Sequence, residues 1–570
     1  MDMKLSAPKY QELLRFIIAM AILVLINIIG NQYYYRFDLT KEKRYSLSAA
    51  TKELLNNLDD VVYVKIYLEG DFPAGFKRLQ RATRDMLEEF KSYARGNIVY
   101  EFINPSKGTA AEKEALYKEL INKGLLPTNL RVKGDEQLSE RIIFPGALFY
   151  YRNKELPVHL LENQIGFSPQ EVLNHSIELL EYKFANSIKK LIQRIPPTVL
   201  FSRGQGELAG AQIADIMQTL RNLQYECDTI NLRASLLPLR TKVLVVAKPL
   251  QAFREQEKFK IDQFIMNGGS VLWLIDPVIA EMDSLRGRSV FLAQQRNLNL
   301  DDQFFRYGFR VNTDLLMDLQ CNRIPLITGS LGNVPQTELF PWYYFPLVTP
   351  RNEHAIVRNL DAIDLHFAST IDTVGKSFAT HPLRKIALLH SSPYSKALLA
   401  PVRIHFSMLR EPPDPSAFMQ KNLMLALLVE GKFESVFKNR LHPDFQAVLD
   451  SLKRPFRDEG VFSRMIIVGD GDVIRNAVSS SGGTYPLGYY PFTEQTFANK
   501  EFILNCIEYL ADDNRLIETR NKEIRLRLLD TTRIRNEKLQ WQLLNTLLPL
   551  LVVMVFGLFY NWMRKRKYAS

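Results

Sequence analysis

The two longest apolar stretches of the chain lie close to its ends. Residues 13–30 read LLRFIIAMAILVLINIIG, and residues 543–560 read LLNTLLPLLVVMVFGLFY. Each stretch approaches the roughly 20 apolar residues that a helix needs to cross a bilayer, and aromatic side chains flank both. The pattern predicts one transmembrane helix at each end. A cleaved signal peptide is the alternative for the first stretch, but bulky and polar residues stand where a cleavage site needs small ones.

Two membrane spans place both termini on one side and the body of the chain on the other. The run Arg564–Lys567 adds four positive charges behind the second span, which favours a cytoplasmic C-terminus. Basic residues lie on both sides of the first span and weaken the indication that charge gives of the orientation. We therefore expect cytoplasmic termini and an extracytoplasmic body, on the strength of the basic tail.

The first part of the body alternates between strand-like and helix-like patterns. Alternating β-branched runs predict strands, and apolar residues at three- and four-residue spacing predict helices. The expected strands are 61–68, 98–103, 129–132 and 147–152, and the expected helices are 76–94, 110–123 and 173–194. This order matches a thioredoxin-like sandwich. The segment after the first strand reads EGDFPAG, without the Cys-x-x-Cys of a redox thioredoxin, so we expect no redox function.

A second α/β pattern begins after Ile195-Pro196-Pro197, because a helix does not continue through two prolines. Continuous apolar runs predict strands at 198–202, 225–232, 242–247, 270–275 and 464–468, with helices within 204–223, 255–267 and 499–510. Such strands are buried on both faces, which indicates a parallel sheet covered by helices. The stretch 280–415 is mixed and aromatic-rich, and a charged helix is expected between residue 515 and the second span.

Composition and charge narrow the classes of function. The 570 residues are 46% hydrophobic and 24% charged, which is typical of globular domains. The formal net charge is +11, but four of these charges stand in the tail and the others are too dispersed for a nucleic-acid interface. Because of this dispersed charge, nucleic acid is not an expected partner. Three cysteines, Cys227, Cys321 and Cys506, cannot form a disulfide framework.

A glycine-containing turn follows the first strand of the second part. Residues 204–209 read GQGELA, which fits the G-x-G-x-x-A pattern of a dinucleotide-binding turn. Arg203 and Glu207 put bulky charges where a pyrophosphate needs a close approach, so an ordinary tight turn is favoured. Gly375-Lys376-Ser377 resembles the end of a phosphate-binding loop, but Thr370 stands where the first glycine belongs. We expect no nucleotide site and no cofactor.

Four acidic residues directly after apolar strands are candidates for a site: Glu207, Asp276, Asp470 and Asp472. The carboxyl ends of parallel strands share one sheet edge, where such side chains could bind a metal or act as acid and base. The structural alternative is that they cap helices and form turns. No His-Glu-x-x-His sequence and no Cys/His pair at metal spacing occurs, so we assign no metal ligand and no catalytic residue.

Two functional hypotheses stand beside a non-catalytic role. One is a metal-assisted hydrolase that uses Asp276, Asp470 and Asp472. The other is a receptor whose small ligand binds at the sheet edge near Arg203 and Glu207. A bound metal at the aspartates would favour the first hypothesis, and a thermal shift with a small molecule would favour the second.

Eight sequence blocks, in order along the chain, point to one family. They are RFDLTKEKRYSLSAATKELL (36–55), FSRGQGE (201–207), NGGSVLWLIDP (267–277), HAIVRNLDAIDLHFASTIDT (354–373), LLHSSPYS (388–395), LLVEGKFESVFKNR (427–440), RMIIVGDGDVIRN (464–476) and PFTEQTFANKEFILNCIEYLADD (491–513). With these blocks the chain resembles the GldG family, the membrane-anchored accessory subunits of gliding-motility-associated ABC transporters of Bacteroidetes. The resemblance implies a GldF-like permease and a GldA-like ATPase as partners, and other periplasmic envelope proteins as a further class of partner.

The resemblance also implies a location and a fold. The body is expected on the periplasmic side of the bacterial inner membrane, and the region from Pro196 onward is similar to the glutamine-amidotransferase-like fold. Enzymes of that fold need a nucleophilic cysteine at a strand–helix elbow, and no cysteine stands at one here, so a non-catalytic α/β protein is expected. The expected parts are a cytoplasmic N-terminus (1–12), a transmembrane helix (13–31), a thioredoxin-like domain (32–195), an amidotransferase-like domain (196–514), a juxtamembrane helix (515–541), a second transmembrane helix (542–562) and a basic cytoplasmic tail (563–570).

Overall fold

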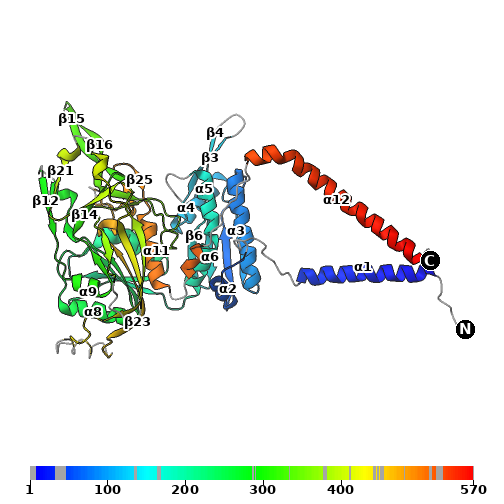
Figure 1. Ribbon diagram of the computed structural model, residues 1–570, viewed down its shortest axis with the longest axis horizontal. Helices are drawn as coiled ribbons and strands as arrows, with labels where there is room; N and C mark the ends of the chain where they lie inside the picture. Colours follow the sequence, from blue (N-terminus) through cyan, green and yellow to red (C-terminus); the bar gives the residue numbers. More distant parts are fainter. Residues whose placement is uncertain are drawn as a thin grey trace. The chain divides into compact units, whose positions relative to one another are not determined.

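The computed structural model has two compact units, a large mixed α/β unit that ends at Lys522 and a small one that contains the last helix (Figure 1). The described residues are 8–32, 46–133, 138–162, 168–285, 288, 290–332, 334–375, 382–409, 413–440, 445, 449, 455–479, 482–512, 516–521 and 531–568.

A four-stranded sheet forms the centre of the first part of the large unit. Its strands are β1 (Val62–Ile66), β2 (Ile98–Phe102), β5 (Gly146–Tyr151) and β6 (Lys154–His159), in the order β2-β1-β5-β6. β1 and β2 are parallel, whereas β5 runs antiparallel to both β1 and β6. Buried and half-buried positions alternate along β1, so one face of that strand carries the apolar core.

Two strand assignments in this part differ from the expectation. The strand expected at 129–132 exists as β3 (Thr128–Lys133), but it pairs with β4 (Leu138–Ile143) in a separate hairpin and does not join the sheet. β6 was not expected, because Pro157 interrupts its β-like pattern. It pairs with β5 across a tight turn in which Arg152 has a φ of 51°.

Helices accompany the four-stranded sheet and bury aromatic side chains against it. They are α2 (Ala49–Asn56), α3 (Ala74–Tyr93), α4 (Ala110–Asn122), α5 (Pro169–Glu178) and α6 (Leu180–Ile192). The single helix expected over 173–194 is therefore two helices. Phe184 of α6 lies edge-on to Phe90 of α3 and packs beside Phe149 of β5, with ring centroids 6.0 and 5.3 Å away. Such aromatic contacts join the helices to the sheet.

A seven-stranded sheet forms the centre of the second part. Its order is β19-β22-β23-β10-β9-β7-β8. The strands are β7 (Thr198–Arg203), β8 (Glu226–Asn231), β9 (Thr241–Ala247), β10 (Ser270–Leu274), β19 (Arg384–His390), β22 (Met424–Glu434) and β23 (Glu459–Val468). The five strands from β8 to β23 are parallel, as the apolar runs predicted, and β22 and β19 add an antiparallel edge.

Both faces of the seven-stranded sheet are covered by helices. Val243 and Val245 of β9 face a core shared with α7 (Ala214–Asn222) and α11 (Asn499–Ala511). Leu244 and Val246 face a second core shared with α8 (Glu255–Met266) and α9 (Asp301–Arg306). Figure 1 shows these two helices on the side away from α11. The continuous apolar runs in these strands follow from this double burial.

Shorter strands and 3-10 helices complete the large unit. The strands are β11 (Val278–Ile279), β12 (Val290–Gln295), β13 (Phe309–Val311), β14 (Asp314–Asp318), β15 (Cys321–Leu331), β16 (Val334–Val348), β17 (Ile363–Asp364), β18 (Ile371–Thr373), β20 (Ser395–Leu399), β21 (Val402–His405), β24 (Tyr489–Tyr490) and β25 (Gln495–Thr496). The 3-10 helices are η1 (Gly210–Ile213), η2 (Met282–Leu285), η3 (Phe406–Leu409), η4 (Pro415–Ala417), η5 (Asp472–Ile474) and η6 (Leu516–Asn521). An aromatic core around Trp342, Tyr344 and Phe345 is shared by β11, β12, β14, β15, β16 and β21.

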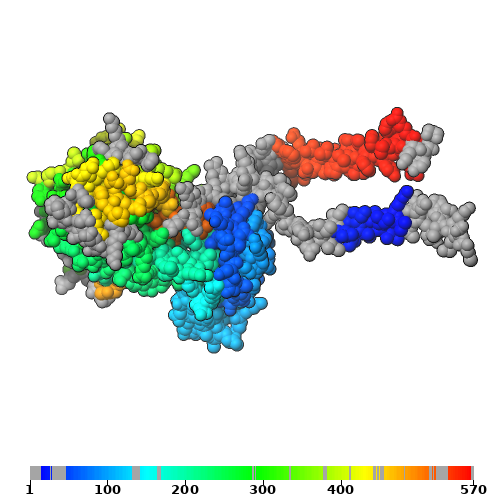
Figure 2. Space-filling model, turned by 90° about the horizontal axis from the view of Figure 1, so that it is seen from below, coloured from blue at the N-terminus to red at the C-terminus, as the bar shows by residue number. Residues whose placement is uncertain are grey.

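The two parts of the large unit meet along α6 and α11. In Figure 2 the blue to cyan segments from α2 to α6 lie together, and the green and yellow segments of the second part lie together. Glu508 of α11 accepts hydrogen bonds from Tyr182, Asn186 and Lys190 of α6. Burial raises the pKa of Glu508, but the Lys190 ammonium and the other donors lower it more, so the net shift is downward. A charged, fully hydrogen-bonded contact therefore fixes one part to the other.

The two terminal helices differ in their apolar length. α12 (Thr531–Tyr568) contains a segment, Glu537–Arg566, that is long and apolar enough to cross a membrane. α1 (Pro8–Gln32) contains a shorter apolar segment, Leu14–Leu25. Of the expected juxtamembrane helix over 515–541, residues 515 and 522–530 lie outside the described residues, and residues 531–541 are helical. Leu516–Asn521 is a 3-10 turn whose Leu516 is buried in the core of the first part, and α12 begins at Thr531.

Candidate functional site

Four charged residues meet at the carboxyl edge of the seven-stranded sheet. Lys248 follows β9, Asp276 follows β10, and Asp470 and Asp472 follow β23. These three strands are adjacent and parallel, so their carboxyl ends open onto the same edge. The structure therefore brings together the three aspartates that the sequence predicted, and adds a lysine that the sequence reasoning missed.

Lys248 binds the carboxylates together. Its Nζ lies 2.6 Å from Asp472, 3.2 Å from Asp276 and 3.4 Å from Glu281, and its side chain is 2% exposed. The backbone N–H of Gly471 donates to Asp276 at 2.5 Å. A buried ammonium surrounded by carboxylates is a compensated charge cluster, in which each member depends on the others.

Burial and mutual charge shift the proton affinities of these groups in opposite directions. Burial raises the pKa of Asp276 to about 6, although Lys248 opposes the shift. Burial also raises the pKa of Asp470 well above its usual range, with the charges of Asp276 and Asp472 acting in the same direction. The pKa of Asp472 is lowered despite burial, because Lys248 and Arg475 favour its charged form. Within the cluster, Asp470 therefore binds a proton more readily than an ordinary aspartate, whereas Asp472 favours the charged form.

This geometry bears on the metal-assisted hydrolase hypothesis. The ammonium of Lys248 lies between Asp276 and Asp472, where the hypothesis requires a metal cation. Across the part of the chain that the structure describes, no group of three or more His, Cys, Asp or Glu side chains is arranged to hold a metal ion. The residues present do not fit a metal centre at these aspartates.

Arg203 and Glu207 are not part of the cluster that Lys248 and the aspartates form. Glu207 is buried and accepts hydrogen bonds from the Ser202 hydroxyl at 2.9 Å and the Gln205 backbone N–H at 2.8 Å. It therefore stabilises the glycine-containing turn after β7. Arg203 is exposed at the end of β7. Among the described residues, neither side chain forms a hydrogen bond or ion pair with Asp276, Asp470 or Asp472.

The turn itself has the geometry of a tight turn with a side chain packed on it. Gly204 and Gly206 have φ values of +120° and +79°, a conformation that favours glycine. The Leu250 side chain comes within 3.2 Å of the position that a Cβ on Gly206 would take. This packing leaves little room for a pyrophosphate, in agreement with the tight turn that the sequence favoured.

A cavity of about 520 Å³ opens beside the aspartate cluster. Asp472 belongs to both the cluster and the cavity wall. The polar side chains of the lining include Glu281, Asp283, Asp364, His366, Asp472 and Arg475. The aromatic ones are Phe345, Phe367, Phe406, Tyr489, Tyr490 and Phe492. A volume of this size with an apolar wall and a few polar groups is typical of small-ligand sites.

Asp364 and His366 form a fixed pair in the wall of this cavity. The His366 Nε2 lies 3.2 Å from Asp364 Oδ2, and its ring stacks on Phe345 with centroids 3.9 Å apart. Burial lowers the pKa of His366, but the carboxylates of Asp364, Asp470 and Asp472 raise it more. No sequence pattern predicted this pair. Its only signal was the Asp-Leu-His spacing, which puts both side chains on one face of an extended segment.

The backbone of the pair is held by side chains from two other segments. Asn499 at the start of α11 accepts from the Asp364 N–H at 3.0 Å and donates to its carbonyl at 2.8 Å. Asp470 accepts from the His366 N–H at 2.7 Å. The aspartate cluster and the cavity wall are thus mechanically connected.

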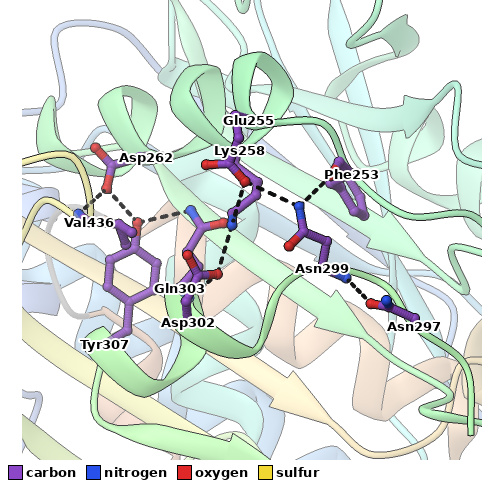
Figure 3. A network of polar contacts seen from close by, with 10 residues as sticks. All are labelled: Phe253, Glu255, Lys258, Asp262, Asn297, Asn299, Asp302, Gln303, Tyr307 and Val436. Carbon is purple, nitrogen blue, oxygen red and sulfur yellow. Dashed lines mark hydrogen bonds and ion pairs between the residues drawn. The ribbon is translucent and has the colours of Figure 1, made fainter. Parts of the chain in front are cut away.

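A second buried polar network lies between α8 and α9, on the other side of the sheet (Figure 3). Asp262 accepts hydrogen bonds from the Tyr307 hydroxyl at 2.9 Å and the Val436 N–H at 3.0 Å. The Nζ of Lys258 lies 2.7 Å from Asp302. Burial outweighs the donors and raises the pKa of Asp262. The carboxylates of Asp262 and Asp302 are thus paired with donors from neighbouring segments, so we assign this network to the packing of α8 on α9 and not to a second site.

The cysteines lack the environment of a nucleophile. Burial raises the pKa of Cys227 and of Cys321 to about 12, and that of Cys506 well above its ordinary value. All three are free thiols, and Cys227 and Cys506 are buried. A thiol must form a thiolate to attack a substrate, so none of these side chains is poised for catalysis.

Comparison with known proteins gives matches over both parts. A family model described as an ABC-type uncharacterized transport system matches residues 196–506, and a domain of unknown function matches residues 41–150. An uncharacterized protein of Borreliella burgdorferi is 21% identical over 98% of this chain and 99% of its own length. A solved structure, the mmIFT52 N-terminal domain, is 12% identical and covers 55% of this chain and 97% of its own length, with a TM-score of 0.30. That score is too low to assign a shared fold.

Proposed function

Since this chain belongs to the ABC transporter auxiliary family, we propose that it is a non-catalytic, membrane-anchored accessory subunit of an ABC transporter. The family match over residues 196–506 carries the proposal, because it spans more than half of the chain and includes the whole seven-stranded sheet. Membership implies association with an ABC transport system. The apolar segment of α12 supports attachment to the membrane.

The finer assignment follows the GldG family. We propose a GldF-like permease and a separate GldA-like ATPase as partners, a role in gliding motility, and contact with periplasmic envelope proteins. The eight sequence blocks support this assignment, and seven of them lie within or next to the family match. The proposed parts are a thioredoxin-like domain over 32–195 and an amidotransferase-like domain over 196–514. The separate four- and seven-stranded sheets support this division.

The chemistry of the described residues supports a non-catalytic role. The buried lysine of the aspartate cluster takes the place of a catalytic cation, and the thiols are protonated at neutral pH. The small-ligand receptor is the second candidate, because the cavity beside Asp472 has a suitable size. Its location is next to the aspartates and not at Arg203 and Glu207.

Purification from the native membrane tests the transporter assignment. The tagged chain is extracted in a mild detergent, and the proteins that co-elute are identified by mass spectrometry. We expect a polytopic permease and an ATPase in stoichiometric amounts, lost when Leu543–Tyr560 is replaced by an unrelated apolar helix of equal length. The exchanged helix keeps the chain in the membrane, so a loss of partners would be due to the sequence of the original helix. Recovery of the unaltered chain alone in several detergents would refute the assignment.

The proposed sidedness is tested by labelling with a membrane-impermeant maleimide. Leu239 is 65% exposed in the large unit, and Ser570 ends the basic tail. In a Cys321→Ser background, Leu239→Cys should be labelled in intact spheroplasts, whereas Ser570→Cys should be labelled only after permeabilisation. The reverse pattern would place the body in the cytoplasm and contradict the proposed periplasmic location.

A further inference from the structure

The cavity beside the aspartate cluster has a carboxylate whose hydrogen bonding is incomplete. Asp364 lines this cavity and is 7% exposed. Its Oδ2 accepts from the Asn322 amide at 3.0 Å and lies 3.2 Å from His366. Its Oδ1 is buried and has no hydrogen-bond partner among the described residues. Buried acceptors in folded proteins nearly always have a donor, so an oxygen without one, in the wall of a cavity, points to a ligand that donates.

The charge of the lining indicates which kind of donor fits. Four carboxylates, Glu281, Asp283, Asp364 and Asp472, face two basic groups, His366 and Arg475. Even with both basic groups protonated, four negative charges against two positive ones leave the lining at −2. Behind the wall, the Lys248–Asp276 pair adds no net charge. A net negative, partly desolvated site favours a cation over an anion or a neutral group.

The remaining wall is aromatic and suits the apolar part of such a ligand. Phe406 and Tyr490 line the cavity, and Phe492, which is 54% exposed, lies beside Tyr490 with ring centroids 5.3 Å apart. Aromatic rings attract cations through their faces and bury hydrocarbon stems.

We propose that this cavity binds an organic cation, an ammonium or guanidinium group on a hydrocarbon stem. The cationic group donates to Asp364 Oδ1, and the stem lies along Phe406, Tyr490 and Phe492. Two sources carry this chemistry: a free amine, and the lysine or arginine side chain of a protein that the transporter subunit engages. Binding is measured on the purified chain alone, so the result does not depend on whether the chain docks to a transporter.

Calorimetric titration of the full chain in detergent with a matched series of five-carbon ligands tests the chemistry. The probes are 1,5-diaminopentane, 1,5-pentanediol and glutarate, which share a stem and differ in charge. We expect the diamine to bind, the diol to bind at least about tenfold more weakly because it lacks the charge-assisted hydrogen bond, and glutarate not to bind. A diol that binds as tightly as the diamine would overturn the proposal.

Substitutions locate the binding site. Asp364→Asn keeps the size of the side chain and should weaken diamine binding about tenfold or more. Asp301→Asn, an exposed carboxylate at the start of α9 outside the cavity, should leave the affinity unchanged. If Asp364→Asn does not fold, the exposed cavity residue Val478 gives a second test. Val478→Lys should weaken binding and Val478→Glu should not; equal affinities for this pair, or no effect of Asp364→Asn, would contradict the proposed site.

A peptide probe separates the two sources of the cation. Acetyl-Gly-Lys-Gly-amide presents the same ammonium on a protein backbone, and its norleucine counterpart is the neutral control. Binding of the lysine peptide, but not of the norleucine peptide, identifies a basic side chain of a partner. Binding of the diamine without the lysine peptide identifies a free amine. If neither the diamine nor the lysine peptide binds, the cavity is not a cation site.

Discussion

The buried lysine at the sheet edge gives the sharpest test of how the aspartate cluster is stabilised. Lys248→Met keeps most of the apolar stem and removes only the ammonium. Asp276 and Asp472 then lose their closest cation, at 3.2 and 2.6 Å, while remaining buried. Removing one partner of a buried ion pair typically costs about 3–5 kcal/mol, because the other charge is left uncompensated. Glu281 is 41% exposed and adds little, since water screens its charge.

The pH dependence of this loss has a definite sign. The lowered pKa of Asp472 stabilises the native state above the unfolded-state pKa, and this stabilisation disappears as the pH falls. Without the ammonium of Lys248, the pKa of Asp472 rises and that of Asp276 rises above about 6. Carboxyl groups with a raised pKa bind protons more tightly in the native state, so stability then falls as the pH increases. Lys248→Met should therefore lose more stability at pH 7.5 than at pH 4.5.

Urea unfolding followed by tryptophan fluorescence measures this loss. Trp273 and Trp342 are both fully buried, and Trp273 lies in β10, three residues before Asp276. Lys242→Met is the matched control, because Lys242 is exposed on β9, the strand that Lys248 follows, and should change stability by no more than about 0.5 kcal/mol. A loss below about 1 kcal/mol for Lys248→Met at pH 7.5, or equal losses at both pH values, would refute the compensation argument.

Three further predictions follow from separate features. A Cβ at Gly469 would overlap the carbonyl oxygen of Ser369, so Gly469→Ala should lower stability by at least about 2 kcal/mol in a thermal scan. Gly375→Ala, which meets no neighbouring atom, should be nearly neutral; equal effects would contradict the close contact. In a chain without α1, Leu550→Asp at the middle of α12 should reduce the fraction that resists alkaline extraction from membranes, because a central aspartate costs roughly 2.5–3.5 kcal/mol of insertion free energy. Unchanged resistance would argue against α12 as a span. Burial lowers the pKa of His366 but neighbouring carboxylates raise it more, so its stabilisation is present below about pH 6.5 and is lost as the pH rises through the folded-state pKa. His366→Gln should therefore lower the urea midpoint more at pH 5.5 than at pH 9, and a loss independent of pH would show that the charge of the ring is not involved.

The sequence predicted the parallel sheet and the meeting of the aspartates from one physical rule. Continuous apolar runs mark strands buried on both faces, and parallel strands end at a common edge. Lys248 escaped notice because a single lysine after an apolar strand is usually solvated at a loop. Its role depends on carboxylates that arrive from strands far along the chain. Glu207 was grouped with the aspartates on the same rule, but it stabilises its own turn.

The residues of the cavity wall could not be predicted from sequence patterns. Asp364 lies at the end of β17, which has two residues and gives no periodicity. Its position is set by Asn499, 135 residues further along the chain. The same applies to Leu516–Asn521, which the charge pattern assigned to a long helix. Tertiary packing of Leu516 into the first part outweighed the local helical preference.

The strand order of the seven-stranded sheet also constrains how the protein is made. β10 pairs on one side with β9, which precedes it directly, and on the other with β23, about 190 residues later. The Ser463 hydroxyl bonds to the Gly269 carbonyl across a separation of 194 residues. During synthesis one edge of β10 therefore stays unpaired until β23 has been made. An unpaired apolar strand edge promotes aggregation, and a pairing this distant in sequence makes folding slow. Fragments that contain β10 but end before residue 468 keep that edge unpaired, so a soluble fragment of the second part is expected only when it includes β23.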